Sequence, residues 1–375
     1  MPRSTLEDRV RSLIDESGQT QEAFGASIGL DATKLSKALN GHRRFSSLDL
    51  ARIADACRVT VDWLLTGQET GVAARISADG STVKKAVTEA AKLAESRDNL
   101  NFLGLPQDWP KPPVPRSSLW IEQGAELAEF ALQHLGPPNV IGSSETFAGA
   151  VERAFGIDVR VLELDGGCDG LAFWSRGGAR VLLVAATENP TRQRFTMAHE
   201  LAHLLCRDDQ DLHVDENVMV GSRGNASEVR ANAFAAALLM PESLLKERFT
   251  DGEVTESTFA EAVMELMVSP SSLAWRLLNL KLLSSEQRAQ LGSLRTIDCA
   301  AADDRINDYA AWVEASSQSR IPVRLVKDLL QSYLTGSATL RPLANLLQVP
   351  VELLRRSIES EQDGPEASDE ADFAP

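Results

Sequence analysis

Apolar positions along residues 1–67 recur at the spacing of three to four residues that is typical of amphipathic helices. The pattern is interrupted at Gly18, at Gly29 and at Asn40-Gly41, and a last apolar stretch runs from Val59 to Leu65. The segment therefore predicts five short helices.

Two of these predicted helices have the arrangement of a helix-turn-helix, in which a glycine-containing turn joins a short helix to a second helix with a polar outer surface. The second helix of such a motif presents side chains to the major groove, and basic residues that follow it contact phosphates. The predicted DNA contacts are Gln21, Thr33, Lys34, Lys37, Arg43 and Arg44. The alternative is a small helical bundle that contacts proteins.

The same segment resembles the Xre/lambda-repressor-like DNA-binding domain. The resemblance rests on Thr20-Gln21-x-x-Phe24-Gly25-x-x-Ile28-Gly29-Leu30, Leu35-Ser36-x-x-Leu39-Asn40-Gly41 and Trp63-Leu64-Leu65-Thr66-Gly67. It implies binding to double-stranded DNA at an operator. Because acids and bases nearly cancel here, we expect modest, salt-sensitive binding unless the protein forms a homodimer.

The middle of the chain alternates between helical and strand-like patterns. Helical patterns cover 82–95, 119–135 and 144–155, and the proline-rich run Trp109-Pro110-Lys111-Pro112-Pro113-Val114-Pro115 predicts a stiff spacer at a domain boundary. Strand-like runs at 158–164, 171–175 and 180–186, separated by glycine turns, predict an antiparallel meander.

The C-terminal part reads as helical. Amphipathic patterns cover 306–315 and 323–333, and 340–350 resembles the Leu-Ala-x-Ile-Ala phrase at 50–54. This segment is a packing or dimerisation domain, or else a second helix-turn-helix-like module.

We expect a multi-domain, mainly α protein with a small antiparallel sheet. The predicted divisions are a five-helix DNA-binding domain at 1–67, a helix plus linker at 68–118, a zincin-like (gluzincin-type) α+β peptidase domain at 119–283, a helical domain at 284–358 and an acidic disordered tail at 359–375.

Composition narrows the functional classes. A net charge of −16 over 375 residues argues against broad binding to polyanions, although a local basic patch can still dock DNA. The four cysteines form no CxxC pair, so neither a disulfide framework nor a cysteine-ligated zinc site is expected. No apolar run reaches about 18 residues and the N-terminus is unlike a signal peptide, so we expect a cytoplasmic protein without a membrane partner.

The clearest chemical signal is His199-Glu200-x-x-His203, inside an apolar helical pattern. Positions i and i+4 share a helix face, so both imidazoles can hold one Zn²⁺ while Glu200 reaches the water on the metal. A core helix with two satisfied histidines is the alternative, but the motif is expected by chance only about 0.01 times in such a chain.

Zinc sites that catalyse reactions commonly have three protein ligands, so a third is required. The metzincin arrangement needs glycine at 206 and histidine at 209, but Cys206 and Asp209 stand there. His213 lies in an acidic run that reads as a loop. Glu228 is the better candidate because it opens a second helical pattern whose small residues allow close packing against the first.

These residues resemble the ImmA/IrrE metallopeptidase family. The resemblance rests on Arg194-Phe195-Thr196-x-Ala198-His199-Glu200-Leu201-Ala202-His203-Leu204, on Glu228-x-x-Ala231-Asn232-x-Phe234-Ala235-Ala236-x-Leu238-Leu239-Met240-Pro241 and on Val268-Ser269-x-x-x-Leu273-x-x-Arg276-Leu277-x-x-Leu280. It implies that His199, His203 and Glu228 are zinc ligands and that Glu200 is the general base. The family often has glycine where Ala202 stands, a helical position that tolerates alanine.

The resemblance further implies cleavage of a repressor-type protein in a stress, mobile-element or metabolic response. Candidate residues for stabilising the oxyanion are Arg192, Arg194, Tyr309 and Tyr333. In zinc peptidases an edge strand beside the metal helix commonly holds the substrate, and residues 179–186 are our candidate; a purely structural strand is the alternative. The alternative function is a transcription factor whose peptidase-like domain senses a ligand without proteolysis.

Overall fold

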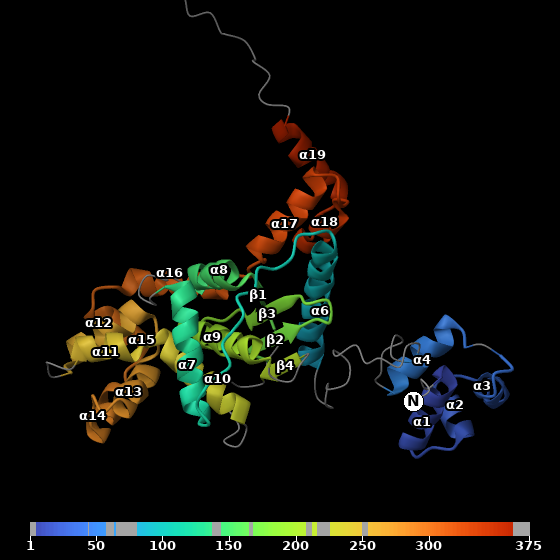
Figure 1. Cartoon of the computed structure of the whole chain (residues 1–375), viewed down its shortest axis with the longest axis horizontal. Coiled ribbons are helices and arrows are strands. Elements are labelled where there is room, and N and C mark those ends of the chain that lie inside the picture. Colours follow the sequence, from blue (N-terminus) through green and yellow to red (C-terminus); the bar gives the residue numbers. More distant parts are fainter. Residues whose placement is uncertain are drawn as a thin grey trace, which may run out of the picture. The chain divides into compact units, whose positions relative to one another are not determined.

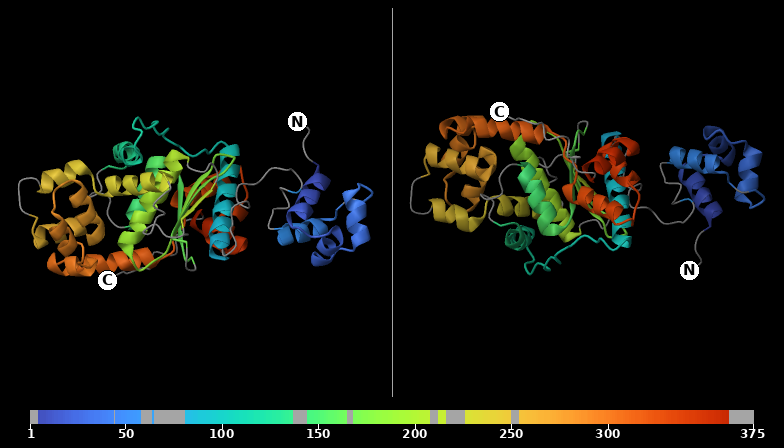
Figure 2. Two further views of the ribbon diagram at one scale, coloured as in Figure 1. Left: turned by 90° about the horizontal axis from the view of Figure 1, so that it is seen from below. Right: turned by 90° about the horizontal axis from the view of Figure 1, so that it is seen from above.

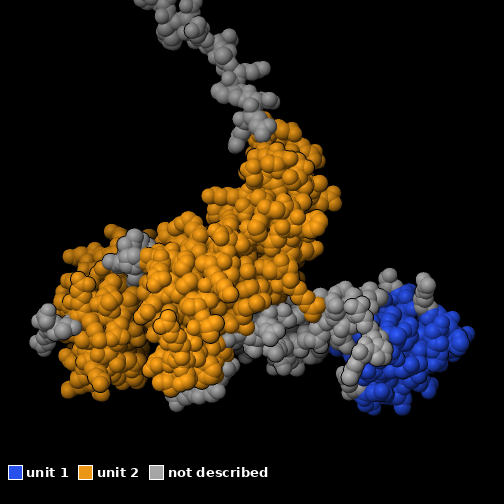
Figure 3. All heavy atoms as spheres, viewed as in Figure 1, with its two compact units in different colours: residues 1–84 blue, residues 85–375 orange. Residues whose placement is uncertain are grey.

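The computed structural model describes residues 5–43, 45–57, 64, 81–136, 144–164, 168–207, 212–215, 226–249 and 254–362. The chain divides into two compact units, Met1–Lys84 and Lys85–Pro375 (Figure 3). Across these ranges, no helix combines the length and the apolar character that crossing a membrane requires.

Unit 1 is helical (Figure 1). Its described helices are α1 (Leu6–Glu16), α2 (Gln21–Ser27), α3 (Ala32–Leu39) and α4 (Ser47–Cys57). Side chains of Thr5, Thr20 and Asp31 cap the first three by accepting backbone N–H groups, as hydroxyl and carboxylate caps do. Of the predicted fifth helix, only the buried Leu64 lies within the described residues.

Glycine allows α2 and α3 to approach closely. A Cβ on Gly25 would lie 3.0 Å from the Leu30 carbonyl oxygen and 3.4 Å from Leu35 Cδ2. Gly29, in the turn between the helices, has a φ of +65°, which favours glycine. These two positions fix the crossing of α2 and α3 over a core that includes Phe24 and Leu35.

Unit 2 is built around a four-stranded mixed sheet. Its strands are β1 (Asp158–Leu162), β2 (Gly170–Trp174), β3 (Arg180–Ala185) and β4 (Leu212–Asp215), in the order β1-β3-β2-β4. β1 is parallel to β3, whereas β2 is antiparallel to both β3 and β4. The predicted antiparallel meander is therefore wrong: β1 pairs with β3, and part of the acidic run read as a loop is strand β4.

The burial of β1 and β3 on both faces explains the order of the strands. All five residues of β1 are buried, as are the four central residues of β3. Strands covered on both faces are typical of parallel pairing inside a sheet. β3 thus lies between two strands and has no free edge, so the prediction of residues 179–186 as a substrate-holding edge strand is also wrong.

The two edge strands, β1 and β4, differ in what pairs with their outer sides. On β1, the Val161 N–H donates to the Arg320 carbonyl oxygen over 3.0 Å, and the Arg320 N–H donates back over 2.9 Å. β4 pairs with β2 on one side, and among the described residues no strand pairs with its other side.

Helices cover both faces of the sheet. Figure 2 shows the sheet edge-on, with α6 (Ser81–Phe102) on one face and α9 (Pro190–Cys206) on the other. The helices that join α9 on its side are α7 (Trp120–Leu135), α8 (Ser144–Phe155) and α10 (Ala226–Leu239). The core between them includes the fully buried Phe147, Phe155 and Phe234.

The remaining described helices complete a mainly helical unit. They are α11 (Glu242–Phe249), α12 (Glu256–Leu266), α13 (Pro270–Asn279), α14 (Ser285–Leu291), α15 (Thr296–Ala302), α16 (Ile306–Ser317), α17 (Val323–Leu334), α18 (Arg341–Leu347) and α19 (Val351–Gln362). α19 includes the first four residues of the predicted tail, and 363–375 lie outside the described residues.

The proline-rich segment belongs to unit 2 rather than forming a spacer between the units. Trp109 packs against Phe155 and Trp174, with ring centroids 6.1 Å and 5.5 Å away, and the Arg180 guanidinium lies 4.6 Å from the Trp109 ring. The division into compact units falls instead at Lys84, near the start of α6. Aromatic contacts thus hold a segment that the prolines alone mark as a linker.

Candidate metal centre

The start of helix α9 is defined by Asn189 and Pro190. Asn189 caps it, since its Oδ1 accepts the Arg192 N–H over 3.0 Å, and Pro190 occupies the first turn, where a missing N–H has no cost. The helix ends at Arg207, which has a left-handed φ of 54°. His199, Glu200 and His203 lie in the second half of this helix, and all three are buried.

Helix α10 is held against α9 and α7 through small residues. A Cβ on Gly124 of α7 would lie 2.5 Å from the Arg230 carbonyl oxygen and 2.8 Å from the Phe234 nitrogen. The backbones of α7 and α10 therefore meet without an intervening side chain. This contact fixes α10 just beyond its first turn, which carries Glu228.

The three predicted ligands converge. His199 Nε2 and His203 Nε2 are 3.1 Å apart, and they lie 3.3 Å and 3.5 Å from the two carboxylate oxygens of Glu228. A tetrahedral ion about 2.1 Å from each ligand atom would separate those atoms by about 3.4 Å. The observed separations, measured to the nearer Glu228 oxygen in each case, are close to that value, and one ligand atom from each residue lies within 4.8 Å of the others, so this buried donor set of two imidazoles and one carboxylate can hold a zinc ion.

Asn232 orients one of the imidazoles. Its Oδ1 lies 3.1 Å from His199 Nδ1, the ring nitrogen that faces away from Glu228. When Nδ1–H donates to this oxygen, the lone pair of Nε2 is free to bind a metal. This role of Asn232 was not predicted, although the spacing Glu228-x-x-x-Asn232 puts both side chains on one face of α10.

Gly170 makes room for Glu200. A Cβ at Gly170 would lie 2.8 Å from Glu200 Cγ, 3.0 Å from Glu200 Oε1 and 2.7 Å from Thr196 Cγ2. Strand β2 therefore passes directly over the carboxylate that follows His199. The role of Gly170 was not predicted, because no local pattern shows which helix a strand will cross.

The contacts that the structure describes for the four residues predicted as candidates to stabilise the oxyanion lie elsewhere than at the metal cluster. Arg192 forms an ion pair with Asp169, and the buried Arg194 guanidinium lies 4.8 Å from the Phe147 ring. Burial lowers the pKa of Arg194 to about 10. Tyr309 packs against the core, and Tyr333 is half-buried on α17. None of these contacts involves the metal cluster, so no residue is assigned to the oxyanion.

The predicted DNA contacts lie in unit 1. Gln21 at the start of α2, and Thr33, Lys34 and Lys37 on α3, are exposed. Arg43 is half-buried and forms an ion pair with Asp49 over 2.7 Å, which draws its guanidinium toward the protein. Arg44 lies outside the described residues.

The similarity to known proteins includes the part of the chain that carries His199, His203 and Glu228. IrrE, a radiation response metalloprotease of Deinococcus radiodurans, is 36% identical over 99 residues, which make up 26% of this chain and 30% of that protein. The radiation response metalloprotease IrrE of Deinococcus deserti is 37% identical over 99 residues, 26% of this chain and 35% of that protein. The chain thus spans about a third of the length of these relatives. Residues 152–278, which include α9 and α10, match the family described as IrrE N-terminal-like domain. This chain therefore carries an IrrE N-terminal-like domain, of metallopeptidase type, at residues 152–278.

Proposed function

We propose that this protein is a DNA-binding regulator whose second unit is a zinc endopeptidase that cleaves a repressor-type protein in a stress, mobile-element or metabolic response. The observation that carries the proposal is the convergence of His199, His203 and Glu228 at separations of 3.1–3.5 Å, suited to one tetrahedral ion. Glu200, next to the first of these ligands, supplies the general base.

The chemistry assigns a separate task to each side chain. When bound, Zn²⁺ supplies a Lewis acid that polarises the scissile carbonyl and lowers the pKa of the attacking water. His199, His203 and Glu228 hold the ion, and Asn232 keeps the His199 ring oriented. Glu200 accepts a proton from the water as the new C–O bond forms, and delivers it to the leaving amine as the C–N bond breaks.

We further infer that the substrate extends along β4. This strand is next to β2, whose Gly170 lies against Glu200, and Gly170 is opposite Asp215 in the register. A peptide that pairs with the outer edge of β4 would gain main-chain hydrogen bonds beside the metal helix. This assignment replaces residues 179–186, which lie inside the sheet.

DNA binding is proposed for unit 1. Its support is the exposure of Thr33, Lys34 and Lys37 on α3, the helix after the Gly29 turn. We expect Lys34→Ala with Lys37→Ala to weaken binding to duplex DNA and to reduce the salt dependence, because each lost phosphate contact lowers the slope of log K against log salt by about 1. A footprint and a salt slope equal to those of the unmodified protein would count against α3 as the groove-reading helix.

The protease assignment is tested with Glu200→Gln, because this change removes the base and leaves the three ligands in place. Cells that express this variant are compared with cells that express the exposed α7 substitution Glu129→Gln, by mapping new protein N-termini. We expect specific cleavage products only with the control, and one zinc ion per chain in both variants.

The alternative, a transcription factor that senses a ligand without proteolysis, predicts a different outcome. In that case Glu200→Gln would bind zinc, produce the same set of N-termini as the control and leave gene regulation unchanged. Such a result would reject the peptidase and retain the regulator.

A further inference from the structure

A groove of about 1080 Å³ lies apart from the metal cluster, between α8, strand β1 and the segment that joins α16 to α17. Val161 of β1 lines it, and Gln193 of α9 contributes to its wall. Its charged lining comprises Arg153, Arg320, Arg324, Lys327, Glu152 and Asp328.

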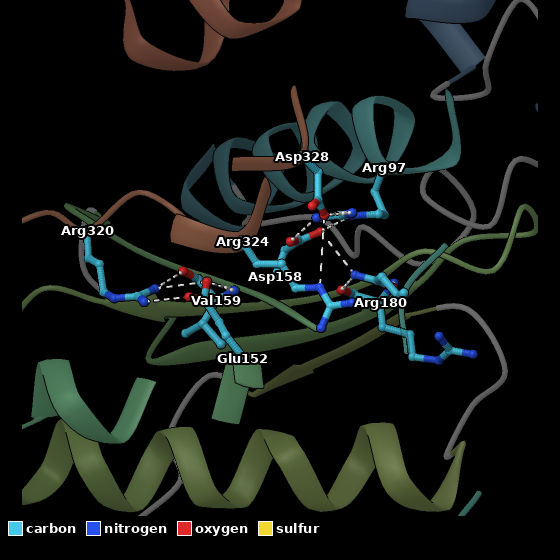
Figure 4. Close-up of polar contacts among 9 residues, drawn as sticks. Arg97, Glu152, Asp158, Val159, Arg180, Arg320, Arg324 and Asp328 are labelled. Atoms are coloured by element: carbon cyan, nitrogen blue, oxygen red, sulfur yellow. Dashed lines mark hydrogen bonds and ion pairs between the residues drawn. The ribbon is translucent and has the colours of Figure 1, made fainter. Parts of the chain in front are cut away.

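Both acids of the groove already have cationic partners. Arg320 Nη2 lies 2.6 Å from Glu152 Oε2, and Arg320 Nη1 lies 3.1 Å from Glu152 Oε1. Asp328 Oδ2 accepts from Nη1 of Arg97 over 2.5 Å, and Arg97 is a fully buried residue outside the groove lining. Figure 4 shows these two pairs on either side of β1. Arg320 therefore neutralises Glu152, whereas Asp328 shares the charge of Arg97 with the fully buried Asp158.

If Arg97 and its buried partner Asp158 are counted with the lining, five cations face three carboxylates, so two positive charges remain in excess. Arg324 Nε is 3.9 Å from Asp328, which also accepts from Arg97. Within the described ranges, no ion pair or hydrogen bond is formed by the Arg153 or Lys327 side chain. In a chain with a net charge of −16, such a local excess of positive charge is unusual.

The cations surround a common space. A Cβ on Gly149 would lie 3.3 Å from Arg153 Nη1 and 4.0 Å from Arg320 Nη2, so both guanidinium groups converge over this glycine of α8. On α17, Arg324 and Lys327 are three residues apart and share a helix face. The N-terminus of α17 adds positive potential, because its cap residue Pro322 accepts no backbone N–H through a side chain.

We propose that this groove binds a small molecule that carries phosphate groups. Guanidinium groups bind phosphate oxygens in pairs, and the first turn of a helix offers further N–H donors. The volume is near the upper end of small-ligand sites. Because Arg153 and Arg320 lie together over Gly149, and Arg324 and Lys327 share one face of α17, the positive charge is clustered, so a compact polyanion fits better than an extended acidic peptide.

The groove also touches the helix that carries the metal ligands. Gln193 Nε2 donates to the Ala185 carbonyl oxygen over 2.9 Å and to the Ser316 carbonyl oxygen over 2.8 Å. Gln193 precedes His199 by six residues, about 9 Å along the helix axis. A ligand in the groove would therefore contact α9 and would allow the regulator to respond to a small molecule. This inference goes beyond the proposed proteolysis and does not depend on it.

The test is calorimetric titration of the full-length, zinc-loaded protein with pyrophosphate in excess Mg²⁺. The test variant is Arg153→Gln with Lys327→Gln, and the matched control is Lys111→Gln with Arg356→Gln, which removes two exposed charges elsewhere in unit 2. We expect one binding event per chain, at least tenfold weaker in the test variant than in the control. Gly149→Leu, which fills the groove floor without a change of charge, is expected to weaken binding as well; circular dichroism and zinc content verify the fold of each variant.

Two results would overturn the proposal: pyrophosphate binding of equal strength in the test variant and the control, or groove-dependent binding of a synthetic peptide of residues 359–375 that is tighter than that of pyrophosphate. The variant Glu200→Gln is expected to bind pyrophosphate as the unmodified protein does. Loss of proteolysis and loss of ligand binding are thus measured separately.

Discussion

Asn232 offers the sharpest test of the metal centre, because it acts on the ion only through His199. The change Asn232→Ala removes the oxygen that lies 3.1 Å from Nδ1 of a fully buried imidazole. The His199 N–H is then left without this acceptor, and the tautomer with Nε2 free is no longer favoured. Removal of such an outer partner typically lowers metal affinity by about 10- to 100-fold, equivalent to about 1.4–2.8 kcal/mol.

The affinity is measured by competition for zinc with a chromophoric chelator. Asn307→Ala, at an exposed position of α16, is the matched control and is expected to leave the affinity unchanged. Asn232→Asp keeps an acceptor at the same place and is expected to retain or increase zinc affinity, because a carboxylate makes the imidazole more basic. If Asn232→Ala and Asn307→Ala bind zinc equally well, the orienting role is refuted.

Three further predictions concern stability and activity. Gly170→Ala places a Cβ 2.8 Å from Glu200 Cγ. We therefore expect the free energy of unfolding in urea to fall by about 1–3 kcal/mol and peptide hydrolysis to slow, with zinc binding retained. An unchanged unfolding midpoint and an unchanged rate of hydrolysis would refute the close contact. Arg97→Ala leaves the fully buried Asp158 without its bidentate partner and is expected to lower the free energy of unfolding by about 3–5 kcal/mol in the same assay. A loss below about 1 kcal/mol would show that the pair is not needed for stability. Backbone hydrogen bonds at the start of α3 lower the pKa of Asp31 below its usual 3.8, so the Asp31 cap stabilises unit 1 above that pH, and this stabilisation is lost as the pH falls through the lowered value. In thermal melts at pH 6 and pH 3, the loss of melting temperature at the lower pH should be smaller for Asp31→Asn than for the unmodified protein. An equal loss would contradict this.

The sequence indicated helices α9 and α10 because their signals are local. Asn189 and Pro190 mark the start of α9, and the i, i+4 spacing of His199 and His203 puts both imidazoles on one face. The position of Glu228 in the first turn of a helix rich in small residues also follows from neighbouring residues. Its distance from the imidazoles does not, because it depends on how α7 and α10 pack.

The order of the strands was not predictable in the same way. Polar and apolar residues alternate in β1, a pattern typical of a strand with one solvent-exposed face, yet Asp158 and Arg160 are buried. The reason is long-range: Arg97 pairs with Asp158, and Arg160 donates to the Arg320 carbonyl oxygen. Partners 61 and 160 residues away convert polar positions into interior ones, and a pattern of period two contains no information about them.

The meeting of α7 and α10 at Gly124 has a consequence for how the protein exchanges its ion. Because backbone touches backbone there, α10 cannot move relative to α7 just beyond the turn that bears Glu228 unless the two helices separate. Release of the ion then requires a local opening of the core, which is slower than the rotation of one carboxylate. We therefore expect a bound zinc ion to persist through dilution and brief chelation.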